Sequence, residues 1–434
     1  MDNGYYAWMI VATALVLMMT TPALALFYGG MTRSKSVLNM MMMSYLAMGV
    51  IGIVFVLWGW SMGWGGDGIG NSNGKLIASP FHMWELHGVA PASYIYVLFQ
   101  LTFAAITAAL ISGSIADRVK ISSWIVFIVG WVTLAYFPIA HNVWAGGWLY
   151  THFPNLDYAG GTVVHINAGI AGGVLALIIG KRIGFNKDPM RPHNLTLTMI
   201  GAGLLWFGWY GFNVGSIIFT DASTKSWGGF TQQFQGETGQ TFMNTTLATM
   251  AAMLGWLVVE RFLHGKATSL GAASGVVAGL VAITPSCGAV DINGALIIGV
   301  LAGILCALAV NLKYKIGLDD SLDVVGVHLT GGIFGALAIG FVGTVKGSPQ
   351  GVDGFFPAGT NGLFHGGDLT LLGHQAMGVL FTLVVSGVVT AVLGLAIKYT
   401  MGWRISEEAE VEGIDSDQHG ESAYDLAPGS GVLS

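Results

Sequence analysis

The stretch GGTVVHINAGIAGG, residues 160–173, places one titratable residue, His165, in an apolar run that is rich in glycine. An ionisable side chain inside the hydrocarbon layer is costly, and such residues usually face the interior of a helix bundle. Glycines in a membrane helix let neighbouring backbones approach closely. The stretch therefore predicts a tightly packed transmembrane helix with a polar ring turned toward the inside of the bundle.

The whole chain has the composition of a membrane protein. Of its 434 residues, 53% are hydrophobic and only 9% are charged, and the mean hydropathy is +0.67. A soluble protein could not cover its surface with so little charge. The net charge of −6 reflects acids gathered at one end, and no basic patch suggests a nucleic-acid partner.

Charged residues divide the chain into eleven uncharged runs of 21 or more residues. About 20 apolar residues suffice to cross a bilayer as a helix. Runs this long and apolar are unsuited to barrel strands. We therefore predict an all-α polytopic membrane protein with eleven transmembrane helices, one in each run. The runs are 3–32, 36–66, 86–116, 121–156, 158–180, 192–220, 238–259, 267–290, 292–312, 324–345 and 369–397.

The basic residues predict the orientation. With the N-terminus outside, 14 of the 17 Lys and Arg residues fall in inside loops, and only Lys75, Lys225 and Lys346 fall outside. Inside loops carry the excess of positive charge, so we expect an N-out, C-in topology. Residues 1–400 would form the transport domain. Residues 401–434, with eight acids between Glu407 and Asp425, would form a cytoplasmic tail that composition predicts to be partly ordered at most.

A second histidine stands in a similar context. HINAGIAGG begins at His165 and HLTGGIFGA begins at His328, 163 residues later. Spans 1–5 and 6–10 would then be two halves, inverted because each has an odd number of helices, with span 11 outside the repeat. Transporters of this kind place their sites between the halves. The alternative is a chance likeness between two glycine-rich helices.

Two imidazoles at matching positions indicate a particular chemistry. We find no HExxH motif and no acid near the rings within their spans, so we expect neither a metal nor another cofactor. A neutral imidazole offers one donor and one acceptor. Two rings in contact could share a proton and form a relay or a hydrogen-bonding rail for a small guest. The alternative is that they only shape the pore.

Aromatic residues predict an outer site. Trp144 and Ser216 fall at the outer ends of spans 4 and 6. An indole face beside a hydroxyl attracts a small cation, and phenylalanines beneath it would form a dry constriction. Ammonium, unlike potassium, donates hydrogen bonds and can give up a proton, so this layout suits ammonium.

The sequence resembles the ammonium transporter family (Amt/Mep/Rh), on its bacterial-type Amt branch, across nearly the whole chain. Four stretches carry the resemblance: ALFYGGMTRSKSVLNM at 25–40, DYAGGTVVHINAGIAGG at 157–173, FGWYGFNVGS at 207–216 and DSLDVVGVHLTGGIFG at 320–335. Tyr158 stands where the family usually has Phe, a departure that we expect to change little.

The resemblance implies roles for individual residues. His165 and His328 would be the twin pore histidines, and Phe103 and Phe212 the stacked phenylalanine gate. Further implied roles concern the outer site and the acid near it. Trp144, Phe103 and Ser216 would recruit ammonium, Trp209 would line the pore, and Asp157 would be the acid near the outer site. Asp157 could cap its helix or also aid deprotonation, and we favour the cap.

The resemblance also implies partners and a location. Ammonium or methylammonium would be the substrate, and ammonia and a proton would pass along the histidines. The protein would be a homotrimer in the cell membrane, and its tail would dock a cytoplasmic P-II signalling protein. Three other functions stay open: an ammonium sensor, a neutral gas channel of the Rh type and, least favoured because no catalytic constellation occurs, a membrane enzyme.

Overall fold

The computed structural model describes residues 3–65, 74–219, 227–344 and 361–424. Within these residues the chain is helical, and its β-structure consists of two isolated bridges, Val119–Arg404 and Val290–Gly343. Ten helical segments are long and apolar enough to cross a membrane. They are Asn3–Met31, Val37–Trp64, Pro91–Ile115, Ile121–His152, Gly161–Ile179, Leu195–Val214, Gly229–His264, Ile292–Ile316, Val325–Val342 and Leu369–Thr400.

The ten segments account for ten of the eleven predicted runs. The remaining run, 267–290, contains the shorter apolar helix α13, Ser269–Ile283. This helix gives way to turns just before Pro285, which cannot donate a backbone hydrogen bond. The structure therefore confirms an all-α fold with about ten membrane-spanning helices, whereas a count of eleven crossings stays a prediction.

Many of the segments are built from more than one helix. In the first half they contain α1 (Asn3–Met18), α2 (Ala25–Met31), α3 (Val37–Val54), α4 (Trp60–Trp64), α5 (Tyr94–Ser112), α6 (Ile121–Trp131), α7 (Phe137–Trp144), α8 (Trp148–His152) and α9 (Asn167–Ile179). The second half contains α10 (Leu195–Val214), α12 (Trp227–His264), α13, α14 (Ile292–Ile316), α15 (Thr330–Val342) and α16 (Leu369–Thr400).

Five π-helical turns interrupt the described segments. They are η1 (Met19–Leu24), η2 (Phe55–Gly59), η6 (Val132–Tyr136), η7 (Gly161–Ile166) and η8 (Val325–Leu329). A π turn widens the helix by one residue and is often found at functional sites. The last two are of most interest here because each carries one of the histidines that the sequence singles out.

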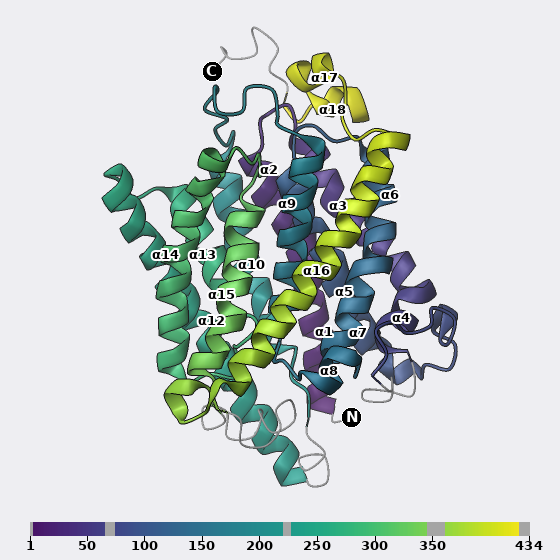
Figure 1. Cartoon of the computed structure of the whole chain (residues 1–434), viewed down its shortest axis with the longest axis vertical. Coiled ribbons are helices and arrows are strands. Elements are labelled where there is room, and N and C mark those ends of the chain that lie inside the picture. The colour runs from purple at the N-terminus through teal and green to yellow at the C-terminus, as the bar shows by residue number, and fades with distance from the viewer. Residues whose placement is uncertain (1–2, 66–73, 220–226, 345–360, 425–434) are drawn as a thin grey trace, which may run out of the picture.

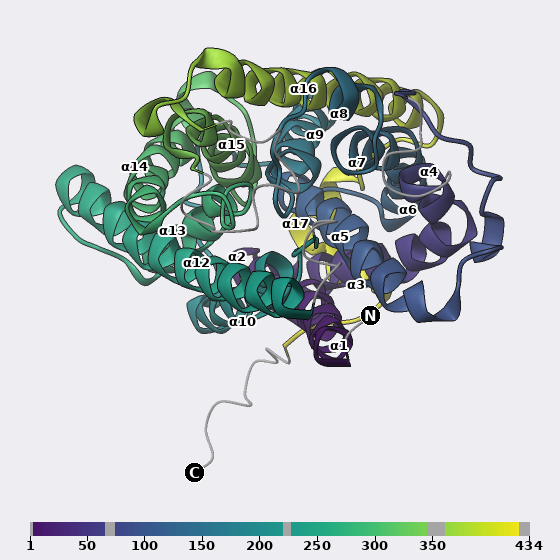
Figure 2. The same ribbon diagram turned by 90° about the horizontal axis from the view of Figure 1, so that it is seen from below.

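The helices form two groups placed side by side (Figure 2). Helices α12 to α15 lie on one side, α3 to α7 lie on the other, and α16 runs diagonally across both (Figure 1). The turn η7 packs against α15, and η8 packs against α9, so each histidine-bearing turn contacts the helix that follows the other one. Such a reciprocal exchange is what a two-fold relation between the halves would produce.

Glycines allow the close packing of η7 on α15 and of η8 on α9. A Cβ atom on Gly169 would lie 2.6 Å from the Leu329 backbone nitrogen, and one on Gly332 would lie 3.2 Å from the Gly161 carbonyl oxygen. Gly169 and Gly332 are again 163 residues apart. The two helices therefore approach so closely at this point that any side chain on Gly169 would push their backbones apart.

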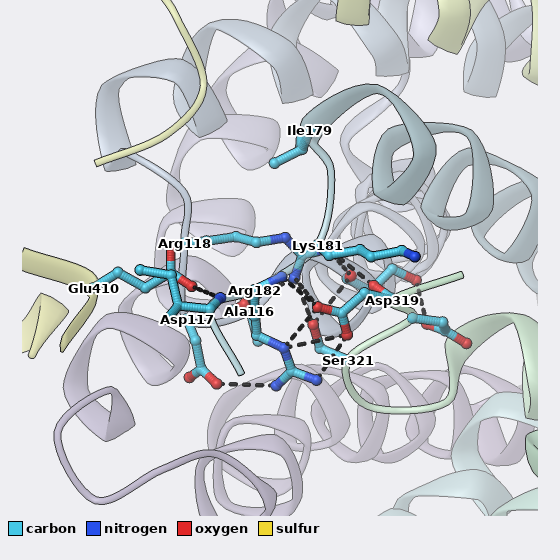
Figure 3. A network of polar contacts seen from close by, with 12 residues as sticks. Ala116, Asp117, Arg118, Ile179, Lys181, Arg182, Asp319, Ser321 and Glu410 are labelled. Atoms are coloured by element: carbon cyan, nitrogen blue, oxygen red, sulfur yellow. Dashed lines mark hydrogen bonds and ion pairs between the residues drawn. The ribbon is translucent and has the colours of Figure 1, made fainter. Parts of the chain in front are cut away.

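A buried network of charges joins three loops at the end of the bundle near α17 and α18 (Figure 3). Arg182 binds Asp117 at 3.0 Å and Asp319 at 2.8 Å, and Arg118 donates to the Ser321 hydroxyl at 2.6 Å. Burial alone would raise the pKa of Asp319, but hydrogen bonds and charge from Arg182 and Arg118 outweigh burial and hold that pKa below its usual value. The network therefore ties the loop after α5 to the loops after α9 and before η8.

The first part of the tail folds onto this end of the bundle. It forms two short helices, α17 (Glu407–Glu412) and α18 (Ile414–His419). The Asp415 carboxylate accepts from the Leu38 and Asn39 backbone nitrogens at 3.0 and 2.8 Å, and so caps the start of α3. Charge at a helix N-terminus explains why part of a tail that composition predicts to be partly ordered at most is held in place.

Candidate substrate path

The structure brings His165 and His328 into contact. Their Nδ1 atoms lie 3.3 Å apart, and their ring centroids are separated by 5.3 Å. Both rings are buried, with exposed fractions of 1% and 4%. Because an Nδ1–Nδ1 hydrogen bond needs one donor and one acceptor, the neutral pair carries its second proton on the Nε2 atom of the accepting ring. The pair thus ends in one donor and one acceptor.

The free end of the pair is available to a guest. The Nε2 atom of His165 is buried and has no hydrogen-bond partner among the described residues. A buried polar atom without a partner is costly, and it suggests a group that is satisfied only when something else is bound. Trp209 stacks beside His165, with centroids 5.5 Å apart, and its indole N–H donates to Thr284 at 2.8 Å.

An acid at an equivalent position precedes each of the turns that carry the histidines. Asp157 accepts from the Thr162 and Val163 backbone nitrogens at 2.8 and 3.0 Å, and it also binds Gly160 and Gly161. These contacts satisfy the free N–H groups at the start of η7. Asp157 lines neither of the two pockets described below.

Asp320 does the same for the second histidine. It accepts from the Val324 and Val325 nitrogens at 3.1 and 2.7 Å, and from the Ser114 hydroxyl at 2.8 Å. This residue was not predicted from the sequence, although the eight-residue spacing from acid to histidine is the same in both stretches and would have revealed it. Each histidine is therefore positioned by a carboxylate at the start of its own π turn.

A small apolar cavity surrounds the histidines. Its volume is about 10 Å³, close to the minimum needed for one water-sized molecule. Apart from the two histidines, its lining consists of aliphatic, aromatic and methionine side chains. It is lined by Met19, Leu24, Phe27, Ile106, Leu110, Val164, His165, Leu205, Trp209, Phe212, Val277 and His328. Such a space suits a small neutral molecule and disfavours a hydrated ion.

Phe103 and Phe212 stack on each other beside the cavity. Their rings stack with centroids 4.0 Å apart and an interplanar angle of 6°. Phe212 lines the histidine cavity, whereas Phe103 lines a second pocket. The stacked pair therefore lies between the two pockets.

The second pocket has a volume of about 20 Å³ and contains the predicted outer-site residues. Trp144 lies edge-to-face against Phe103, with centroids 6.1 Å apart, and donates its N–H to the Asp157 carbonyl at 2.8 Å. Ser216 donates to the Phe212 carbonyl at 2.8 Å, which leaves its oxygen lone pairs free to accept. The pocket is lined by Tyr96, Phe99, Gln100, Phe103, Trp144, Tyr158, Gly215, Ser216, Ile217 and Ile218.

The pocket also contains an acceptor that the sequence analysis did not name. Gln100 is 7% exposed, and its amide oxygen has no hydrogen-bond partner among the described residues. Its amide nitrogen donates to the Tyr96 hydroxyl at 3.2 Å. An aromatic wall with free oxygen acceptors suits a small cation that donates hydrogen bonds. The apolar helical fold with internal pockets is typical of a membrane transport protein.

Comparison with known proteins identifies the family. The model of the Ammonium Transporter Family matches residues 7–424. The ammonium transporter of Mycobacterium tuberculosis (strain H37Rv) is 49% identical, over 100% of this chain and 92% of that protein. The chain belongs to the ammonium transporter family, and it is a transport protein rather than an enzyme.

Solved structures agree with this assignment. The crystal structure of Saccharomyces cerevisiae Mep2 superposes with a TM-score of 0.81 at 30% identity, covering 94% of this chain and 91% of that chain. A structure described as a sensor Amt protein gives a TM-score of 0.82 at 25% identity, covering 96% of this chain and 98% of that chain. Similar folds thus occur in Mep2 and in a protein described as a sensor.

Proposed function

We propose that this protein recruits ammonium in the pocket of Trp144 and Ser216, removes one proton, and conducts ammonia and the proton past His165 and His328. The observation that carries the proposal is the contact between two buried imidazoles in a dry cavity behind the stacked phenylalanines. The loss of hydration would cost much more free energy for an intact ammonium ion than for neutral ammonia. The histidine pair offers the donor and acceptor that ammonia and a moving proton both need.

Each outer residue has a part in this proposal. Trp144 and Phe103 present ring surfaces to the cation, and Ser216 offers a lone pair to one of its N–H groups. Phe103 and Phe212 form the gate that excludes hydrated potassium. Trp209 supports the His165 ring from the side. Asp157 acts mainly by capping η7, a role favoured by its hydrogen bonds to the first turn.

The test is the current evoked by ammonium in proteoliposomes on a solid-supported membrane. Wild-type protein should give a current with ammonium and none with potassium. The double variant His165→Ala/His328→Ala should lose the ammonium current or become permeable to potassium. A wild-type protein that binds ammonium without any current would overturn proton-coupled transport and favour electroneutral conduction or sensing.

We also propose eleven crossings with the N-terminus outside and the C-terminus inside, as an inverted repeat plus one helix. The N-terminal end of α1 and the helices α17 and α18 lie at opposite ends of the bundle (Figure 1), which supports an odd number of crossings. Counting α13 as the eighth crossing gives this number. The reciprocal packing of η7 on α15 and of η8 on α9 supports the repeat.

Residues 1–400 are proposed as the transport domain and residues 401–434 as a regulatory tail. We propose further that the protein is a homotrimer in the cell membrane and that the tail region docks a P-II signalling protein. The contacts of Asp415 with the start of α3 support a tail that can influence the bundle. A purified P-II protein should inhibit the ammonium current under at least one nucleotide condition. Failure to bind or inhibit under every nucleotide condition would overturn P-II control.

A further inference from the structure

Glu237 is a buried acid for which the path described so far has no use. In the sequence this residue stands just before the uncharged run 238–259, but in the structure it lies within helix α12, with an exposed fraction of 1%. Its Oε1 atom accepts from the Tyr158 hydroxyl at 2.6 Å, and its Oε2 atom accepts from the Gln233 amide at 2.9 Å. Both oxygens therefore have a donor, which is the arrangement that an ionised carboxylate needs.

Glu237 has no positive partner within the part of the chain that the structure describes. Its two donors are neutral, and none of the ion pairs between described residues includes it. A buried charge without an opposite charge is strongly unfavourable. Ionisable residues within membrane segments that lack such compensation commonly mark the route of an ion.

The position of Glu237 connects it to the outer pocket. Tyr158, which donates to it, lines that pocket together with Trp144 and Ser216. The Gln233 amide also donates to the carbonyl of Ile218, another residue of the pocket lining, at 2.9 Å. The carboxylate is thus linked to the pocket wall directly through Tyr158 and indirectly through Gln233. It stands behind a tyrosine ring, where the low dielectric weakens its field less than water would.

The hydroxyl of Tyr158 distinguishes this residue from the Phe that is usual at this position, because the hydroxyl binds Glu237. A phenylalanine at this position would keep the ring but could not donate to Glu237. Gly288 allows the close fit, since a Cβ atom there would lie 2.3 Å from the Tyr158 ring. Tyr158 therefore lines the pocket with its ring and also binds the buried acid through its hydroxyl.

We propose that Glu237 is a cation-attracting carboxylate of the outer pocket, held in place by Tyr158, and that it sets the affinity of the pocket for ammonium. This inference rests on the proposed function, because it assigns the incoming cation as the missing partner of the carboxylate. A negative charge favours ammonium over neutral ammonia, which has no charge to attract. Glu237 acts in binding, at a distance, and takes no part in closing the path.

The test is a concentration series of ammonium-evoked current with full-length protein in proteoliposomes. Glu237→Gln keeps the size and polarity of the side chain but removes its charge. Glu260→Gln is the matched control, because Glu260 lies near the other end of α12 and binds Thr268. We expect the half-saturating ammonium concentration to rise about fivefold or more in Glu237→Gln, with a maximal current like that of wild type. The control should match wild type in both.

Tyr158→Phe provides an independent variant if Glu237→Gln fails to fold. Loss of one donor makes the charged carboxylate less stable, so the half-saturating concentration should rise in the same direction. An unchanged half-saturating concentration in whichever of these variants folds, or a fall in maximal current alone, would overturn the role of Glu237. Absence of any wild-type current would instead overturn the proposed function, so the two failures are distinguishable.

Discussion

Asp157 and Asp320 occupy equivalent positions 163 residues apart, and each carboxylate caps the π turn that carries one of the two facing histidines. The spacing between the two acids equals that between His165 and His328. The backbone repeats as well, because Gly160 and Asp323, again 163 residues apart, both adopt a positive φ, of 116° and 64°. The histidine pair is thus held from both sides by the same local structure.

The first prediction concerns these caps. Asp157→Ala leaves several N–H groups at the start of η7 without an acceptor, so the variant should lose about 1–3 kcal/mol of stability. Asp157→Asn keeps one acceptor oxygen and should lose less. Thermal unfolding in detergent measures both changes. If Asp157→Asn is as stable as wild type yet conducts nothing, the cap is secondary and the acid takes part in deprotonation.

The second prediction concerns the gate. Phe103→Ala removes one of the two stacked rings and enlarges the passage between the outer pocket and the histidine cavity. We expect the current evoked by methylammonium to rise relative to that evoked by ammonium, because the bulkier cation gains more from a wider gate. Currents recorded with each cation at saturating concentration give this ratio. An unchanged ratio would mean that Phe212 alone limits passage.

The third prediction concerns the crossing of the two histidine-bearing helices. Gly169→Ala would place a methyl group 2.6 Å from the Leu329 backbone nitrogen, where the neighbouring backbone must move. Overpacking of this kind costs about 1–3 kcal/mol, so the melting temperature should fall. Gly203→Ala is the control, because a Cβ atom there meets nothing within 4 Å. Equal melting temperatures for both variants would contradict the close approach.

The fourth prediction concerns pH and the charge network. The pKa of Asp319 is lowered in the folded protein, because Arg182 and Arg118 outweigh the effect of burial. An acid whose pKa is lowered by folding stabilises the fold at pH values above its pKa in the unfolded chain, which is near 4. This contribution is lost as the pH falls through the lower pKa of the folded chain. Asp319→Asn should therefore be less stable than wild type at pH 7, and the difference should shrink below about pH 4.

Thermal unfolding at a series of pH values tests the fourth prediction. Asp188→Asn is a suitable control, because Asp188 is exposed and forms no ion pair with the described residues. It should match wild type at every pH. A stability difference for Asp319→Asn that stays constant down to the lowest pH would show that the loss arises from packing rather than from charge.

The all-α membrane fold could be predicted from the sequence, and the sequence also supplied the candidate site residues. Long uncharged runs must be helices in a bilayer, because no water is present to satisfy an open backbone. The repeated glycine-rich context of His165 and His328 indicated a shared site before any contact was known. These predictions need only the hydrophobicity and the spacing of residues, which can be read from the sequence without knowledge of any contact.

Contacts between groups that are distant in the sequence depend on how the helices pack. Three contacts join segments that are far apart in the sequence: the contact between the two Nδ1 atoms, the stacking of Phe103 on Phe212 and the hydrogen bond from Tyr158 to Glu237. From the sequence, Tyr158 was expected to change little, and Glu237 only marked the end of an uncharged run. Neither residue has neighbours in the sequence that indicate its partner. Their significance depends on burial and on a partner 79 residues away, which helix packing alone supplies.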